Sequence, residues 1–91
     1  MVVWIRLFGY LNNCLKRLSK QNRDFEIEIM ENSTIENLLK QLGIPPRELI
    51  LVINPGERER ILIIDGKKMD WKGVILQKND RIWIYPFLDG G

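Results

Sequence analysis

The sequence predicts a single α+β domain, residues 1–91, in which one main helix and shorter helical segments pack on a mixed sheet. Two observations predict this class. Apolar segments with the periodicity of strands occur on both sides of one well-delimited helical segment. The length of 91 residues, against roughly 150 for an average domain, leaves room for one core. The order is strand, strand, helix and then further strands, which predicts a sandwich of two layers.

The first part of the chain predicts two strands joined by a long connection. The opening strand, residues 2–8, has an apolar face formed by Val3, Ile5 and Leu7. In the second strand, acids alternate with Phe25, Ile27 and Ile29. Between the strands, helical spacing predicts a short amphipathic helix with the apolar residues Leu11, Cys14, Leu15 and Leu18. We expect the two strands to form a hairpin.

A capping box, Ser33-Thr34-Ile35-Glu36, predicts where the main helix begins. In this interpretation the Ser33 hydroxyl accepts the Glu36 amide, and the Glu36 carboxylate accepts the Ser33 amide. The apolar stripe of the helix consists of Ile35, Leu38, Leu39 and Leu42. Gly43 suits the left-handed position that ends a helix, and Pro45-Pro46 prevent its continuation.

The last part of the chain predicts three strands. Continuous apolar runs at residues 49–53 and 61–64 are joined by a polar loop, and Ile82-Trp83-Ile84-Tyr85 predicts the last strand. Asp65-Gly66 and Asn79-Asp80 are turn signals. An exposed last strand would be able to pair edge to edge with another chain. We expect the helix stripe to pack on a sheet that includes Val3, Ile5, Ile27, Leu51, Ile53 and Ile82.

The composition excludes several kinds of chemistry. The single cysteine, Cys14, has no partner for an intrachain disulfide, and the absence of histidine argues against a zinc site or a Cys/His nucleophile. The sequence also has no glycine-rich phosphate loop. For these reasons we expect the protein to carry neither a metal nor a cofactor. The longest apolar runs hold five residues, against roughly 20 for a membrane span, which predicts a cytoplasmic protein with no membrane partner.

Other candidate residues have ordinary structural interpretations. The net charge is weak, 14 − 12 = +2, but a basic segment precedes an acidic one. The basic residues Lys16, Arg17, Lys20 and Arg23 are typical of a solvated face, with phosphate or an acidic protein as the alternative ligand. We interpret Cys14 as a core residue. Trp4, Trp71 and Trp83 are interpreted as packing residues, although an exposed Trp4 or Trp83 would suit a protein interface.

The last six residues, Pro86-Phe87-Leu88-Asp89-Gly90-Gly91, form a different kind of candidate site. Two glycines leave the terminal carboxylate on a slim tether that can enter a narrow channel. A carboxylate is ionised at neutral pH and is a poor electrophile, so a partner must activate it before it can react. A frayed glycine end is the alternative interpretation.

Together with earlier motifs, this end resembles the ubiquitin-like sulfur carriers, which include the small subunit of molybdopterin synthase and the thiamine-pathway sulfur carrier. The resemblance rests on Asp65-Gly66, Leu76, Asn79-Asp80, Ile82-Trp83-Ile84, Pro86 and Gly90-Gly91, and it covers the whole chain. It implies the β-grasp fold. It also implies that Gly91 is adenylated by an ATP-dependent activating enzyme and converted to a thiocarboxylate, with Gly90 keeping the tail slim.

The resemblance implies a carrier or co-substrate rather than an enzyme, with the small non-catalytic subunit of a molybdopterin synthase as one form of this role. Its acceptor would be a molybdopterin synthase large subunit or a thiazole synthase, in molybdopterin, tungstopterin or thiamine-type synthesis. Pro86, Phe87, Leu88 and Asp89 would contact these partners. The chain departs from the family at Asn79, where glycine is usual, and at Phe87-Leu88-Asp89, where small or β-branched residues are typical.

Two alternatives remain open at this stage. One is a ubiquitin-like modifier, which passes the same activated carboxylate to a lysine amine. The other is a non-covalent interaction or RNA-binding module that uses the basic segment at residues 16–23; its binding would weaken steeply with salt. We expect no nucleic-acid partner, because the net charge is small.

Overall fold

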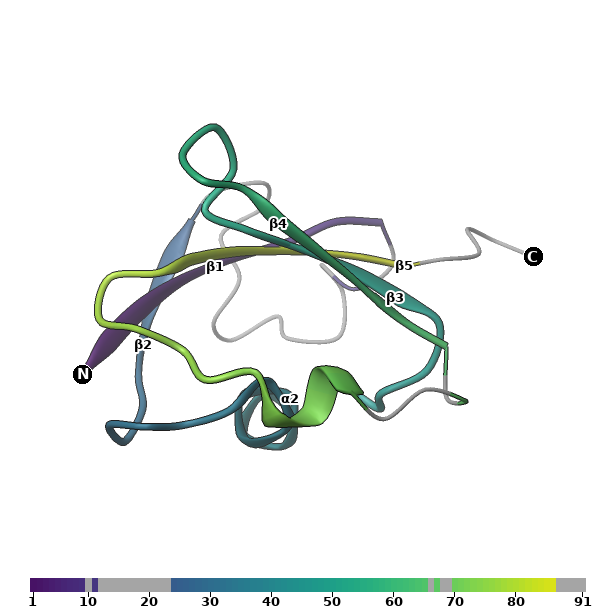
Figure 1. Cartoon of the computed structure of the whole chain (residues 1–91), viewed down its shortest axis with the longest axis horizontal. Coiled ribbons are helices and arrows are strands. Elements are labelled where there is room, and N and C mark those ends of the chain that lie inside the picture. Colours follow the sequence, from purple (N-terminus) through teal and green to yellow (C-terminus); the bar gives the residue numbers. More distant parts are fainter. Residues whose placement is uncertain (10, 12–23, 66, 68–69, 87–91) are drawn as a thin grey trace.

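The computed structural model describes residues 1–9, 11, 24–65, 67 and 70–86, and within them five strands form one sheet with a helix on one face (Figure 1). The elements are β1 (Val2–Leu7), β2 (Phe25–Glu28), α2 (Ile35–Leu42), β3 (Leu49–Ile53), β4 (Arg60–Ile64), η1 (Asp70–Gly73, a 3₁₀ helix) and β5 (Arg81–Pro86). The expected short helix lies outside the described residues except for Leu11, which is buried. The sequence-based expectation of a helix packed on a mixed sheet is confirmed.

The sheet has the strand order β2-β1-β5-β3-β4. Strands β1 and β5 are parallel, with Ile5 opposite Ile82, and the other neighbours are antiparallel. The last strand is therefore not an exposed edge that could pair with another chain. Strand β5 is central, because it pairs with β1 on one side and with β3 on the other. The edges of the described sheet are β2 and β4.

The core lies between α2 and the sheet face that α2 covers. The predicted stripe of the helix is fully buried, with Ile35, Leu38, Leu39 and Leu42 all at most 2% exposed. The sheet contributes the predicted residues Val3, Ile5, Leu51, Ile53 and Ile82, and Ile27 is partly buried against them. Alternation in β1, β3 and β5 directs every second side chain to this face, so periodicity alone located the core correctly.

The helix begins one residue later than the capping box predicts. Thr34 is the N-cap: its Oγ1 accepts the amide of Asn37 at 3.2 Å, and its own amide donates to Asn37 Oδ1 at 3.0 Å. Ser33 does not cap the helix, because its hydroxyl donates to the carbonyl of Met30, three residues earlier in the chain. Glu36 pairs with Lys72 instead of capping. The predicted end of the helix is confirmed, because Gly43 is left-handed with φ of 74°.

The predicted turn at Asn79-Asp80 before β5 is confirmed, and hydrogen bonds connect it to Asn54, the residue that follows β3. Asn79 has a positive φ of 67°. The carboxylate of Asp80, which is buried, accepts the Gln77 amide at 2.7 Å and Asn54 Nδ2 at 3.0 Å. Asn54 Oδ1 in turn accepts the Arg81 amide at 2.9 Å. This network fixes where β5 begins.

Candidate functional site

The end of β5 is the point from which the predicted tail leaves the fold. Pro86 is the last residue of β5, is half-buried and lies opposite Leu49, the first residue of β3. Because β1 and β5 are parallel, Leu7 ends β1 at the same end of the sheet. Of the predicted site residues the structure therefore places Pro86, whereas Phe87, Leu88, Asp89, Gly90 and Gly91 lie outside the described residues.

The sheet face opposite α2, here called the outer face, is largely apolar. Alternation places on it the residues Val2, Trp4, Arg6, Phe8, Ile50, Val52, Ile61, Ile63, Arg81, Trp83 and Tyr85, together with Glu26 and Glu28 of the edge strand β2. Ile61 and Ile63 of β4 are 58% and 54% exposed, and Trp4 of β1 is 36% exposed. An apolar surface of this kind favours contact with another macromolecule.

Three rings on the outer face, Phe8, Trp83 and Tyr85, form a continuous aromatic row toward Pro86. The Phe8 and Tyr85 rings are stacked, with centroids 4.2 Å apart and planes 8° from parallel. The Phe8 and Trp83 centroids lie 5.7 Å apart at an angle of 59°. Since Tyr85 precedes Pro86 in the chain, the aromatic row ends at the root of the tail.

Two arginines lie over the Trp83 ring at the other end of the aromatic row. The guanidinium carbon of Arg6 is 5.1 Å from the ring centroid and that of Arg81 is 5.9 Å away. Asp24 holds both, accepting from Arg6 Nε at 3.0 Å and from Arg81 Nη2 at 3.4 Å. Ion pairs this exposed add little stability, so their main effect is to fix the two guanidinium groups over Trp83.

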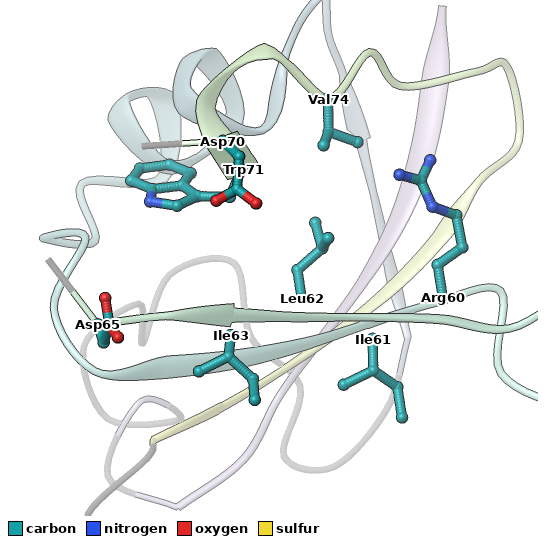
Figure 2. Close-up of a pocket in the computed structure, with 8 residues that line it drawn as sticks. All are labelled: Arg60, Ile61, Leu62, Ile63, Asp65, Asp70, Trp71 and Val74. Carbon is teal, nitrogen blue, oxygen red and sulfur yellow. The ribbon is translucent and has the colours of Figure 1, made fainter. Parts of the chain in front are cut away.

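A hollow of about 470 Å³ lies elsewhere in the fold, between the edge strand β4 and the η1 segment. Figure 2 shows Arg60 and Leu62 on the same side of β4 as Asp70, Trp71 and Val74, with Ile61 and Ile63 directed to the other side. Trp71 is 3% exposed, and its Nε1 has no hydrogen-bond acceptor among the described residues. Sequence reasoning missed this hollow, because Trp71 comes close to β4 only in the folded chain.

The other candidates from the sequence are not assembled into a site that the structure describes. Cys14 and the basic residues Lys16, Arg17, Lys20 and Arg23 lie outside the described residues. Within the described part of the chain, no three His, Cys, Asp or Glu side chains are grouped to hold a metal ion. No helix in that same part is long and apolar enough to cross a membrane. The sequence admitted an exposed Trp4 or Trp83, but it could not show that the Phe8 ring packs against Trp83 and Tyr85 of β5.

The mixed sheet with its strand order, its central last strand and its single packed helix is the ubiquitin-like β-grasp fold. Among solved structures, the crystal structure of SAMP1 from Haloferax volcanii is similar, with a TM-score of 0.63, 13% sequence identity and coverage of 100% of both chains. Comparisons with protein-family models and with curated proteins give no match. The likeness shows a ubiquitin-like β-grasp fold.

Proposed function

We propose that the protein is a sulfur carrier whose terminal residue, Gly91, is adenylated and then converted to a thiocarboxylate. One observation carries the proposal: Pro86 ends the central strand of a ubiquitin-like fold, and the sequence continues from it into a short tail that closes with Gly90 and Gly91. The tail residues Phe87, Leu88 and Asp89 separate these glycines from the sheet.

The architecture supports this role because it fixes the root of the tail. Strand β5 is held along both sides, and the network of Asp80 and Asn54 fixes its start. Five residues, from Phe87 to Gly91, reach at most about 18 Å beyond Pro86. A partner that docks on the domain can therefore receive the carboxylate at a defined distance from the docking surface.

The outer face is the proposed docking surface for the ATP-dependent activating enzyme. The aromatic row ends next to Pro86, so a partner bound there lies beside the tail. Aromatic and arginine side chains are the types enriched at interfaces between proteins, and Arg6 and Arg81 already lie over Trp83. The fixed rings would lose little conformational entropy on binding.

The chemistry takes place at the Gly91 carboxylate. One carboxylate oxygen attacks the α-phosphate of ATP, and pyrophosphate leaves. Hydrosulfide, or a donor that delivers it, then attacks the carbonyl carbon of the acyl adenylate, and AMP leaves with the electron pair of the broken C–O bond. The thioacid formed releases its proton to solvent. The product is a thiocarboxylate. Adenylation is required because a free carboxylate is a poor electrophile.

An acceptor enzyme then uses the thiocarboxylate as its sulfur source. The sulfur attacks an electrophilic carbon of the acceptor's substrate, and the electron pair of the bond broken at that carbon goes to a leaving group or to the heteroatom of a C=O or C=N bond. Water then hydrolyses the resulting thioester, so that the sulfur stays on the substrate as a thiol and Gly91 returns as a carboxylate. By the resemblance, the acceptor is a molybdopterin synthase large subunit or a thiazole synthase. In this proposal the protein is a co-substrate, or a non-catalytic subunit, and needs no cofactor of its own.

Intact-mass spectrometry tests the proposal. The full chain is incubated with a sulfur-carrier activating enzyme, ATP and sulfide, and the C-terminal fragment is examined for one oxygen replaced by sulfur. Omitting ATP is the control. Conjugates to lysine that survive thiol reduction would instead favour the ubiquitin-like modifier. Unchanged mass with a cognate activating enzyme would reject both functions.

A further inference from the structure

The hollow beside β4 has the features of a peptide-binding groove. Its volume of about 470 Å³ lies within the range of about 300–1,000 Å³ that is typical of ligand sites. One wall is β4 and the other is the η1 segment with Trp71 and Val74, while Leu62 lies between them (Figure 2). The groove thus has an apolar floor and runs along a strand.

The strand that forms this wall is an open edge. Strand β4 is last in the sheet order and pairs, within the described chain, with β3 alone. Main-chain groups on its other side are therefore available for an added strand. Edge strands are normally protected by charge, proline or a bulge, whereas β4 carries the exposed residues Ile61 and Ile63. This edge is suited to recognition by strand addition.

The two ends of the groove carry opposite charge. Arg60 lies at one end, and no described residue forms an ion pair with it. Asp65 and Asp70 lie at the other end. From residue 60 to residue 65 an extended strand covers about 17 Å, so the charges match a segment of five or six residues with a base at one end and an acid at the other.

Trp71 provides a second, independent indication of a ligand. The residue is 3% exposed, and its Nε1, like that of Trp83, finds no acceptor among the described residues. In Figure 2 this nitrogen lies on the edge of the ring that is turned toward β4 and Asp65. A buried donor without a partner is uncommon in folded proteins. Because Nε1 is itself buried, a carbonyl of an added strand would accept from it once the indole turns toward β4.

We infer that this groove binds an extended segment of a partner protein as a sixth strand beside β4. The segment has apolar residues at alternate positions, one of which packs on Leu62 and Val74. An Asp or Glu at one end pairs with Arg60, and a Lys or Arg at the other end lies by Asp65 and Asp70. The site is separate from the tail, so it does not depend on the proposed sulfur transfer.

A second copy of this chain is a poorer occupant of the groove than a free segment. If the β4 strands of two copies paired antiparallel, the η1 segments of both copies would lie on the same side of the joined sheet. The two η1 segments, each with its Trp71, would then crowd each other above the paired strands. An extended segment of another protein has no such bulk beside it.

A displayed library of random linear nonapeptides, selected on the full-length protein, tests the inference. We expect enrichment of alternating apolar residues between an acid and a base. When one enriched peptide is titrated into the protein, the NMR signals of the β4 amides and of the Trp71 indole N–H should shift. The indole signal is assigned by its absence from the spectrum of a Trp71→Phe variant. Deletion of Gly91 should leave the affinity unchanged, which separates this site from the tail.

Charge reversal provides the matched control. Arg60→Glu should weaken peptide binding roughly tenfold, the size expected when a favourable charge pair becomes repulsive. Arg58→Glu, the same change two residues earlier and outside the groove, should have little effect. Replacing the acid of the peptide by Lys should restore binding to Arg60→Glu. The inference is overturned if no peptide is enriched, if the shifts map to β2 or the outer face, or if β4 amides shift with protein concentration alone, which would indicate a second copy.

Discussion

The Phe8 ring stacks on the Tyr85 ring with the centroids 4.2 Å apart. The two backbones are also joined here, because the Phe8 amide donates to the Ile84 carbonyl at 3.0 Å. This contact extends the parallel pairing of β1 and β5 beyond Leu7, the last residue of β1. It connects the outer face to the residue that precedes Pro86, so the proposed docking on the outer face and the proposed presentation of the tail would depend on the same pair.

Replacing Phe8 by alanine should therefore impair both stability and tail activation. Loss of the stack and of the half-buried ring is expected to lower the free energy of unfolding by roughly 1–3 kcal/mol. Urea denaturation measures the stability, and thiocarboxylate formation at saturating ATP measures the function under conditions in which the variant is folded. Tyr85→Phe is the control, because it keeps the stack. Equal activation of folded Phe8→Ala and wild type would rule out the aromatic row as the docking surface.

Leu38→Ala should be among the most damaging substitutions for the fold. Leu38 is fully buried at the centre of the helix stripe, so the substitution removes apolar contacts and leaves a cavity. The expected loss is about 2–5 kcal/mol in the free energy of unfolding. Thermal or urea unfolding checks this value. Lys40→Ala, on the exposed side of the same helix, should change stability by less than about 0.5 kcal/mol.

Asp80→Ala should loosen the start of β5. The substitution leaves the Gln77 amide and Asn54 Nδ2 without their acceptor, and unpaired donors of this kind cost about 1–3 kcal/mol. Asn79→Gly is the neighbouring control. Since Asn79 has a φ of 67°, glycine should be tolerated there, with a change near zero or slightly stabilising. Hydrogen exchange at the Arg81 amide, which donates to Asn54, should be faster in Asp80→Ala alone.

Local sequence patterns predicted the main helix and the strands, whereas contacts between residues distant in the sequence decided the start of the helix and the order of the strands. The stripe of α2 and the buried alternation of β1 follow from periodicity, which is a property of neighbouring residues. The helix start was wrong by one residue because the Ser33 carbonyl accepts the Leu76 amide and its hydroxyl donates to Met30. A partner 43 positions away, which is 76 − 33, leaves no local signal.

Strand order was equally hidden from the sequence. The continuous apolar run at residues 61–64 was correctly predicted to be a strand, but its pattern did not show that Ile61 and Ile63 are more than half exposed. They are exposed because β4 is an edge and they lie on the outer face. The sequence pattern of the last strand did not reveal that it occupies the centre of the sheet, between β1 and β3. For the candidate site, the sequence alone supplies the tail from Phe87 to Gly91, whereas the aromatic row and the β4 groove needed the fold.

Cys14→Ala should leave sulfur transfer intact. In the proposed reaction the sulfur is carried on the Gly91 carboxyl group, so no side-chain thiol of this chain takes part. The thiocarboxylate yield per ATP consumed should equal that of the wild type, as measured by intact mass and AMP release. If a folded Cys14→Ala protein failed to acquire sulfur, the Cys14 thiol would be required for the transfer, and the proposed direct attack of hydrosulfide on the acyl adenylate would be wrong.

Deleting Gly91 should separate function from fold. Glycine has no side chain to bury, so the free energy of unfolding should change by only a few tenths of a kcal/mol. Activation should nevertheless be lost, because the carboxylate is withdrawn by up to about 3.5 Å, more than a near-attack geometry at the ATP α-phosphate tolerates. Asp89 and Leu88 are too bulky to follow into a channel shaped for glycines. Intact-mass spectrometry after incubation with the activating enzyme, ATP and sulfide measures the outcome. Restoring one C-terminal glycine should recover the sulfur adduct, and equal sulfur uptake by the shortened chain would show that Gly91 is not the site.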